Sequence, residues 1–131
     1  MESAWTVAPI FRVRDVRAAA AHYRDVLGFD MPDERILTEP GNDNAIYAIA
    51  SRSGVEIHLG RSRDGWRVDP GERPNALGAY LRVPDVRALH DELAGRGARI
   101  IQPPTVEPWG DLVMVVLDLD GYELGFATAP A

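Results

Sequence analysis

The chain has 131 residues, of which 46% are hydrophobic, and this length suits one domain or two small halves with a common core. Its net charge of −6 and its pI of about 5.0 argue against nucleic acid as the main partner, because phosphate binding needs a basic surface. It contains no cysteine, and all 14 basic residues are arginine, so disulfides, thiolate nucleophiles and Schiff-base chemistry are excluded.

Hydrophobic periodicity predicts a strand, a helix and three further extended segments in the first half of the chain. The expected elements, in order, are a strand at about 5–13, a helix capped by Asp15 and ended by Gly28, an extended segment at 29–37, a turn at 39–44, and two hairpin strands at 45–50 and 55–60. Residues 61–75 are polar, with two Pro and two Gly, and are the one candidate linker.

The same order of elements starts again after the linker. The expected elements are a strand at 78–83, a helix from the cap Asp85 to about Arg96, a short strand at 98–103, a loop at 103–111, a strand at 112–119, a turn at 118–121 and a last strand at 122–127. No apolar run approaches the ~20 residues of a membrane span, and no secretory signal pattern opens the chain. We therefore expect a cytoplasmic protein without a membrane partner.

Two phrases of the sequence occur twice. FRVRDVRAA, which starts at Phe11, matches LRVPDVRAL, which starts at Leu81. More weakly, GVEIHL (54–59) matches GYELGF (121–126), at a slightly smaller spacing. The chain is therefore predicted to be a single α+β domain, residues 1–131, of two βαβββ modules formed by duplication. Their expected limits are about 5–60 and 76–127. In each module one sheet face covers the helix, and the two remaining faces would curl around a shared cavity.

The strand that ends in V-x-D, the helix segment AHYRDVLGF and the late D-x-DGYEL hairpin resemble the vicinal oxygen chelate superfamily, which includes glyoxalase, bleomycin-resistance proteins and extradiol dioxygenases. The resemblance covers essentially the whole chain. It implies paired βαβββ modules that form a cup-shaped mixed sheet, in a homodimer.

Enzymes of that family usually hold one divalent metal with side chains from four equivalent positions, and the resemblance places these at Ala8, Gly78, Gly125 and His58. Only His58 has a donor atom, and one imidazole does not hold a catalytic metal against water. Glu56, two residues away on the same strand face, could add at most a second ligand. We therefore predict no metal and no cofactor. The E-x-WG step that contains Trp109 also resembles the metal-free bleomycin-resistance branch.

Seven residues are candidate ligand contacts, and no residue is assigned a catalytic role. The candidates are Trp109, His58, Glu56, Trp66, Tyr47, Tyr80 and Arg12. A loop tryptophan offers a flat ring with an N–H donor, which suits stacking on a planar ligand. Each candidate also has a structural alternative: a lid or a linker anchor for the two tryptophans, a hydrogen bond within the sheet for His58, ion pairs for Glu56 and Arg12, and core packing for the two tyrosines.

The remaining polar residues have structural interpretations. His22 and His90 are expected on the surfaces of the two helices or in packing. Asp118 and Asp120 frame a glycine turn, and turn chemistry accounts for them.

The predicted function is stoichiometric capture of a small molecule, planar or cationic and antibiotic-like, by a metal-free homodimer. The alternative is an enzyme of the same superfamily, a lyase, isomerase or dioxygenase that acts on a small oxygenated substrate. That enzyme would need other metal ligands or metal-free acid–base work by His58 and Glu56. A third possibility is a regulatory or scaffold dimer with a vestigial cavity.

Overall fold

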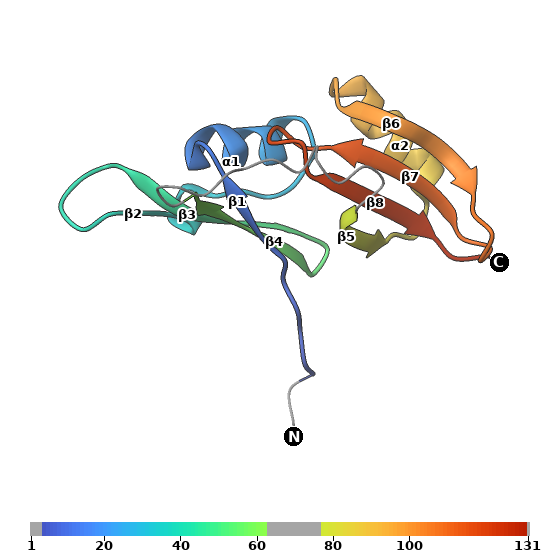
Figure 1. The fold of residues 1–131 in the computed structure, drawn as a ribbon, viewed down its shortest axis with the longest axis horizontal. Coiled ribbons are helices and arrows are strands. Elements are labelled where there is room, and N and C mark those ends of the chain that lie inside the picture. Colours follow the sequence, from blue (N-terminus) through green and yellow to red (C-terminus); the bar gives the residue numbers. More distant parts are fainter. Residues whose placement is uncertain (1–3, 63–76, 131) are drawn as a thin grey trace.

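The computed structural model describes residues 4–62 and 77–130 as two similar halves, each with a helix packed on a four-stranded sheet (Figure 1). The first half contains β1 (Ile10–Val13), α1 (Val16–Asp25), the short 3₁₀ helix η1 (Asp33–Arg35), β2 (Ile36–Thr38), β3 (Ala45–Arg52) and β4 (Val55–Arg61). The second half contains β5 (Leu77–Arg82), α2 (Val86–Gly95), β6 (Arg99–Val106), β7 (Leu112–Leu117) and β8 (Glu123–Thr128). These halves are called module 1 and module 2 below.

The two sheets have the same topology, with strand orders β1-β4-β3-β2 and β5-β8-β7-β6. In each sheet the first strand is parallel to the last one, and the other pairs are antiparallel. Ile10 lies opposite His58 in module 1, and Tyr80 lies opposite Gly125 in module 2. The two repeated phrases align Ile10 with Tyr80 and His58 with Gly125, so the strand register repeats together with the sequence. The α+β class and the paired βαβββ arrangement are thus confirmed.

Both helices begin at the aspartates that the sequence indicates. The Asp15 carboxylate accepts a hydrogen bond from the Ala18 N–H at 3.0 Å, and Asp85 accepts one from the Ala88 N–H at 3.1 Å. Each bond satisfies an N–H group that has no partner within the helix. Both helices are ten residues long, so each packs a short apolar stripe against its own sheet.

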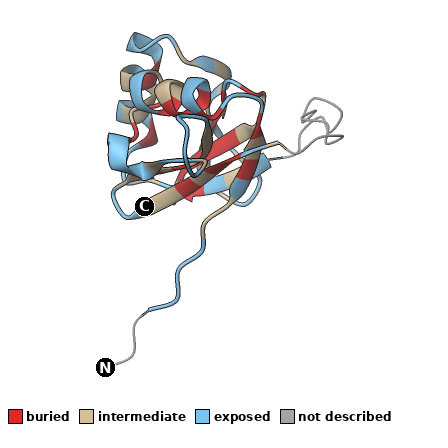
Figure 2. Cartoon of the chain, turned by 90° about the vertical axis from the view of Figure 1, so that its left-hand side faces the viewer, coloured by how far each residue is buried: buried red, intermediate tan, exposed pale blue. Residues whose placement is uncertain are grey.

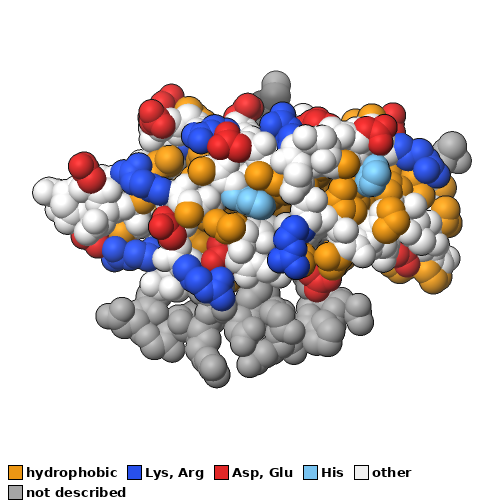
Figure 3. Space-filling model, turned by 90° about the horizontal axis from the view of Figure 1, so that it is seen from above, with side chains coloured by type: hydrophobic (Ala, Val, Ile, Leu, Met, Phe, Trp, Pro, Cys, Tyr) orange, Lys and Arg blue, Asp and Glu red, His pale blue; other side chains and the backbone are white. Residues whose placement is uncertain are grey.

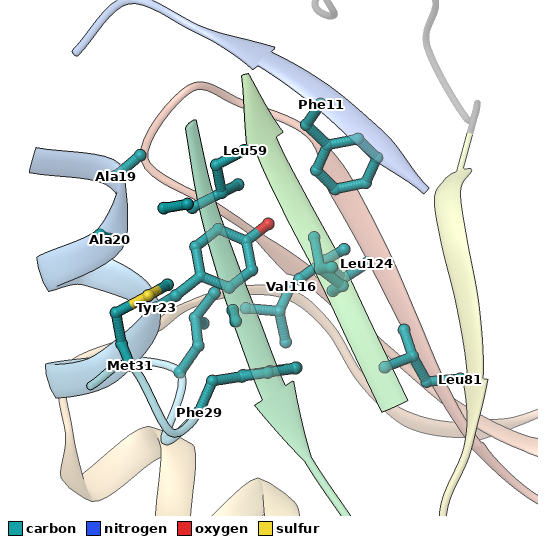
Figure 4. Packing of buried hydrophobic residues seen from close by; sticks show 14 of the residues in the cluster. Phe11, Ala19, Ala20, Tyr23, Phe29, Met31, Leu59, Leu81, Val116 and Leu124 are labelled. Carbon is teal, nitrogen blue, oxygen red and sulfur yellow. The ribbon is translucent and has the colours of Figure 1, made fainter. Parts of the chain in front are cut away.

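One hydrophobic core runs through both modules. Figure 4 shows Tyr23 of α1 and Leu59 of β4 close to Val116 and Leu124 of module 2, and all four are buried in the same cluster. Figure 2 shows the same layering, with the buried residues between the helices and the sheets. The modules therefore form one packed body around a common core.

Several elements have limits that differ from the sequence prediction. The first strand begins at Ile10 instead of residue 5, and residues 4–9 extend away from the body (Figure 2), although they alternate like a strand. The predicted extended segment 29–37 contains the 3₁₀ turn η1. The strand β6 continues through Pro103 and Pro104 into the predicted loop. It can do so because it is an edge strand with register shifts, where a missing N–H leaves no ladder bond unmade.

Arginine and acidic side chains are interspersed on the face seen in Figure 3, with apolar side chains exposed between them. This mixture gives that face no patch of a single charge. Among the described residues, neither helix is long and apolar enough to cross a membrane.

Candidate ligand-binding site

Each sheet has one face on its helix and an opposite face, which we call the open face. In module 1 the alternation of β3 and β4 buries Ala48, Ala50, Ile57 and Leu59 toward α1. The intervening side chains therefore point to the open face, because strand side chains alternate between faces.

Three polar side chains form a chain of hydrogen bonds on the open face of module 1, here called the Tyr47 cluster. The Tyr47 hydroxyl lies 2.6 Å from His58 Nδ1, and His58 Nε2 lies 3.1 Å from Glu56 Oε1. A carboxylate only accepts, so a neutral His58 carries its proton on Nε2 and accepts the Tyr47 proton at Nδ1. Arg35 of η1 lies 3.6 Å from the other Glu56 oxygen. The imidazole is thus oriented from both sides.

Arg12 of β1 lies beside this cluster. A Cβ placed on Gly60 would be 2.8 Å from Arg12 Nη1 and 3.6 Å from Tyr47 Cδ1. Glycine at this position therefore avoids a clash with the Arg12 guanidinium. Arg12 also donates to the Arg61 carbonyl at 3.4 Å.

On module 2 the open face is organised around Asp111, a carboxylate that is only 2% exposed. Its Oδ2 accepts from the Tyr80 hydroxyl at 2.5 Å and from Trp109 Nε1 at 3.2 Å, and it pairs with Arg82 at 3.1 Å. Burial, and then the hydrogen bond to Asp111, raise the pKa of Tyr80. These four residues are called the Asp111 cluster.

Trp109 is held on a rigid turn. The Glu107 N–H donates to the Asp111 carbonyl at 2.9 Å, the Gly110 N–H donates to the Glu107 carbonyl at 2.8 Å, and Gly110 has a φ of +100°. Only glycine adopts such a φ without strain. The Trp109 N–H is occupied by Tyr80 and Asp111, while the side chain stays 61% exposed. The ring is therefore fixed in place and open to stacking.

A pocket of about 360 Å³ opens beside Trp109, within the usual size range of small-molecule sites. Its lining consists of Leu77, Tyr80, Ile101, Gln102, Glu107, Trp109, Val113, Val115 and Glu123. The lining combines apolar and aromatic walls with two carboxylates and one amide. Such a site suits a flat ligand with hydrogen-bond donors or a positive charge.

The structure places the predicted contacts in two groups. Tyr47, His58, Glu56 and Arg12 come together on module 1, and Tyr80 and Trp109 come together on module 2. Among the described residues, no hydrogen bond or ion pair links the two groups. Trp66 lies outside the described residues. The sequence prediction missed Asp111, because nothing in the run W-G-D indicates that this carboxylate is buried.

The positions at which the family resemblance implies a metal do not fit one. Ala8, Gly78 and Gly125 offer no donor, and both nitrogens of His58 already have partners. A Cβ on Gly125 would meet Leu77 at 3.0 Å and Tyr80 at 3.2 Å, so side chains cover this position. No group of three acidic or imidazole side chains among the described residues could hold a metal ion.

The family model of the Glyoxalase/Bleomycin resistance protein/Dioxygenase superfamily matches residues 5–126. Among curated proteins, none matches the sequence closely enough to count as a relative. Solved structures share the fold at low identity.

One is TioX from Micromonospora sp. ML1, with 21% identity, a TM-score of 0.71, and coverage of 95% of this chain and 98% of the other. A second is the bleomycin-binding protein of the bleomycin producer Streptomyces verticillus, complexed with copper(II)-bleomycin, with 24% identity, a TM-score of 0.70 and full coverage of both chains. A third is a bleomycin resistance determinant encoded on the transposon Tn5, with 19% identity, a TM-score of 0.72, and coverage of 98% and 100%.

Proposed function

Because this chain belongs to the Glyoxalase/Bleomycin resistance protein/Dioxygenase superfamily, we propose that it is a cytoplasmic, metal-free binding protein that captures an antibiotic-like small molecule without changing it. The proposal rests on which residues occupy the four positions that hold the metal in enzymes of the family. Ala8, Gly78 and Gly125 cannot coordinate a metal, and Tyr80 and Leu77 cover Gly125. A protein without that metal retains a fold suited to binding.

The pocket beside Trp109 supports capture of a flat ligand that carries donors or a positive charge. Trp109 offers an exposed ring on a fixed turn, and Glu107 and Glu123 add negative charge at the pocket. Stacking on an aromatic ring and attraction to carboxylates both favour a planar cation. Two structural neighbours are named for binding of, or resistance to, bleomycin, and this makes bleomycin the first compound to test.

We further propose that the site is completed in a homodimer. The 360 Å³ pocket involves module 2 alone, while the Tyr47 cluster lies on the separate sheet of module 1. A second copy could bring its module 1 opposite this module 2. The arm of residues 4–9 also favours a second copy, because Trp5 is 100% exposed and Val7 is 91% exposed. Two large apolar side chains exposed on one short arm offer a partner an apolar contact.

The Tyr47 cluster favours a second candidate function, a metal-free enzyme. A tyrosine hydroxyl, an imidazole and a carboxylate in series can pass a proton to or from a bound substrate. In this arrangement Glu56 would orient His58, and His58 would accept the Tyr47 proton. Turnover of a small oxygenated substrate would then depend on His58.

The test of capture is a fluorescence titration with metal-free bleomycin, followed by mass spectrometry of the recovered ligand. We expect saturable quenching of tryptophan fluorescence, with one ligand for each module 2 that faces a module 1 of the second copy. The recovered ligand should have an unchanged mass. Trp109→Ala should weaken binding at least tenfold, because the aromatic ring on which the ligand stacks is lost. The control Leu119→Ala, at an exposed turn residue that does not line the pocket, should retain the affinity of each site.

Two further results would decide between the functions. If the wild type modifies the ligand and His58→Gln does not, the protein is an enzyme and the capture proposal is wrong. Near-stoichiometric metal in protein purified without chelator or affinity tag, or a saturable rise in Tm with one of Zn²⁺, Ni²⁺, Mn²⁺ or Fe²⁺, would overturn the metal-free proposal. Equal affinity of the Trp109→Ala variant and the wild type would place the ligand elsewhere.

A further inference from the structure

The two modules meet at two equivalent junctions. At the first junction the β7–β8 turn lies against α1, where the Tyr23 hydroxyl donates to Asp118 Oδ2 at 2.7 Å. At the second junction the β3–β4 turn lies against α2, where Arg52 donates to the two oxygens of Glu92 at 2.8 and 2.7 Å. Each turn therefore reaches across to the helix of the other module, so the two junctions can be compared residue by residue.

An aromatic pair fills the first junction. The rings of Phe11 and Tyr122 stack with centroids 4.3 Å apart and planes 4° apart. The Tyr122 hydroxyl donates to the backbone carbonyl of Arg12 at 2.8 Å. Both residues belong to the common core or pack against it. This junction is closed by a ring and a phenolic hydroxyl.

The repeat places smaller side chains at the second junction, and a cavity lies there. The repeated phrases align Leu81 with Phe11 and Val55 with Tyr122. Between Leu81 and Val55 is a cavity of about 520 Å³, and the lining residues that matter here are Phe29, Val55, Leu81, Arg82, Val83 and Leu89. Arg52, Ser53, Asp85 and Glu92 also line it. Apolar walls with a few polar groups are the usual form of a small-molecule site.

The charged side chains at this cavity are already bonded within the protein, Asp85 to the Ala88 N–H and Arg82 to Asp111, and this favours an uncharged occupant. Arg52 and Glu92 are bonded to each other, and Arg52 also donates to the Gly28 carbonyl at 3.3 Å. An ion bound here would have to compete with that pair. The repeat aligns Arg82 with Arg12, whose carbonyl accepts the Tyr122 hydroxyl at the first junction. A backbone carbonyl has two lone pairs, so the carbonyl of Arg82 can accept one further hydrogen bond.

We propose that the second-junction cavity is a binding site for a small uncharged phenol. The ring of the phenol packs against Leu81 and Val55. This position at the second junction is equivalent to the one that the Tyr122 ring fills at the first. Its hydroxyl donates to the Arg82 carbonyl, as the Tyr122 hydroxyl does to that of Arg12. The site lies on the helix side of β5 and shares neither Trp109 nor the 360 Å³ pocket with the proposed open-face function.

The probe is p-cresol, which is the side chain of tyrosine as a free molecule. It is titrated into ¹⁵N-labelled protein and followed by ¹H–¹⁵N NMR. We expect saturable one-to-one binding with a Kd on the order of 0.1–1 mM, with the largest shifts at the amides of Val55, Leu81 and Leu89. Toluene, which lacks the hydroxyl, should bind several-fold more weakly.

The decisive variant is Val55→Tyr, which rebuilds the first junction at the second. It should fill the cavity and weaken p-cresol binding at least tenfold. Val106→Tyr is the matched control, because Val106 is an exposed residue of β6 that does not line the cavity. If Val55→Tyr fails to fold, Ala88→Trp blocks the same cavity from an exposed helix position. Trp109→Ala should leave p-cresol binding unchanged.

Four results would overturn the proposal. They are the absence of saturable shifts, equal affinity of Val55→Tyr and the wild type, shifts centred on Trp109, and a tenfold gain of binding in Trp5→Ala. The last result would mean that the arm of a second copy is the occupant of the cavity. None of these results refutes bleomycin capture at the open face, so the two proposals fail separately.

Discussion

The turns at 51–55 and 118–122 have the same place in the two modules but different side chains. Gly54 and Gly121 have nearly the same φ, +85° and +89°, but Ser53 also has a positive φ of +50° while its counterpart Asp120 does not, so the turns share a glycine and differ in backbone one residue earlier. The first turn, SRSGV, keeps its side chains half-buried or exposed, whereas the second, DLDGY, buries Asp118 and Asp120 and adds an aromatic ring. The repeat therefore keeps the place of the turn and its glycine, while the side chains close one junction and leave the other open.

The difference shows that turn chemistry alone, as predicted from the sequence for Asp118 and Asp120, does not account for these two residues. Asp118 accepts the N–H groups of Asp120 and Tyr122, both at 2.9 Å, as a turn residue does. It also accepts the hydroxyl of Tyr23 from the other module. Asp120 accepts the backbone N–H and one guanidinium N–H of Arg14, both at 3.1 Å. The turn thus joins the two modules through hydrogen bonds from its two carboxylates to residues of module 1.

The largest expected effect is on the pH dependence of stability in Asp118→Asn. Burial raises the pKa of Asp118 to about 6 from 3.8, against the lowering by its hydrogen bonds. The fold therefore favours protonated Asp118, and this stabilisation is present below pH 4 and is lost as the pH rises through about 6. The neutral variant should exceed the wild type in free energy of unfolding by about 1–3 kcal/mol at pH 7, and by little at pH 4.

Urea denaturation at pH 4, 5.5 and 7 measures this difference. The control is Asp120→Asn in the same turn, which should lose stability because Asp120 pairs with Arg14. A gap between wild type and Asp118→Asn that stays constant over the three pH values would contradict the assignment.

The next effect concerns the open faces, where His58 of module 1 corresponds to Gly125 of module 2. A Cβ at Gly125 approaches Leu77 and Tyr80, so Gly125→Val should displace Tyr80 from Asp111 and cost about 1–3 kcal/mol. Gly95→Ala is the control, because open space surrounds that position in α2, and it should stabilise by about 0.5–1 kcal/mol. Thermal melts and Trp109 emission report the two effects. An unchanged Trp109 spectrum in Gly125→Val would contradict the coupling.

A smaller effect compares the two open-face clusters directly. Asp111→Asn removes the charge that holds Arg82 and should cost about 1–2 kcal/mol, with faster motion of the Trp109 ring in fluorescence anisotropy. His58→Gln disturbs the Tyr47 cluster, and it should cost stability without altering Trp109 anisotropy. Equal anisotropy changes in the two variants would mean that the clusters are joined.

The sequence was sufficient for the elements that repeat. The phrase that occurs twice predicts both helices and their caps Asp15 and Asp85, and it places Arg12 and Arg82 in equivalent positions, because local spacing determines these features. Strand alternation also placed Glu56 and His58 on one face.

The contacts between the repeats could not be predicted in this way. The burial of Asp111, the bond between Tyr23 and Asp118, and the use of the Trp109 N–H within the protein all depend on residues distant in sequence. The predicted lengths of β1 and β6 were wrong for a related reason. Residues 4–8 lie outside the paired part of the sheet, which starts where the Pro9 carbonyl accepts the His58 N–H, and Pro103 and Pro104 are tolerated because β6 is an edge strand.

The smallest expected effect is that of Arg52→Ala at the open junction. Arg52 makes two bonds to Glu92, but both side chains are about one third exposed, so solvent screening limits the loss to about 0.5–1 kcal/mol. The bond to Arg52 lowers the pKa of Glu92, so this contribution is present at neutral pH and is lost as the pH falls through that lowered pKa.

Arg24→Ala is the matched control, because Arg24 pairs with its exposed neighbour Asp25, and its loss should be near zero. Urea denaturation at low and high salt separates the two, since salt should reduce the Arg52 effect. An Arg52→Ala loss as large as that expected from Gly125→Val would mean that the second junction is held as tightly as the first. The contrast between a closed and an open junction would then be limited to the size of the side chains at Val55 and Leu81.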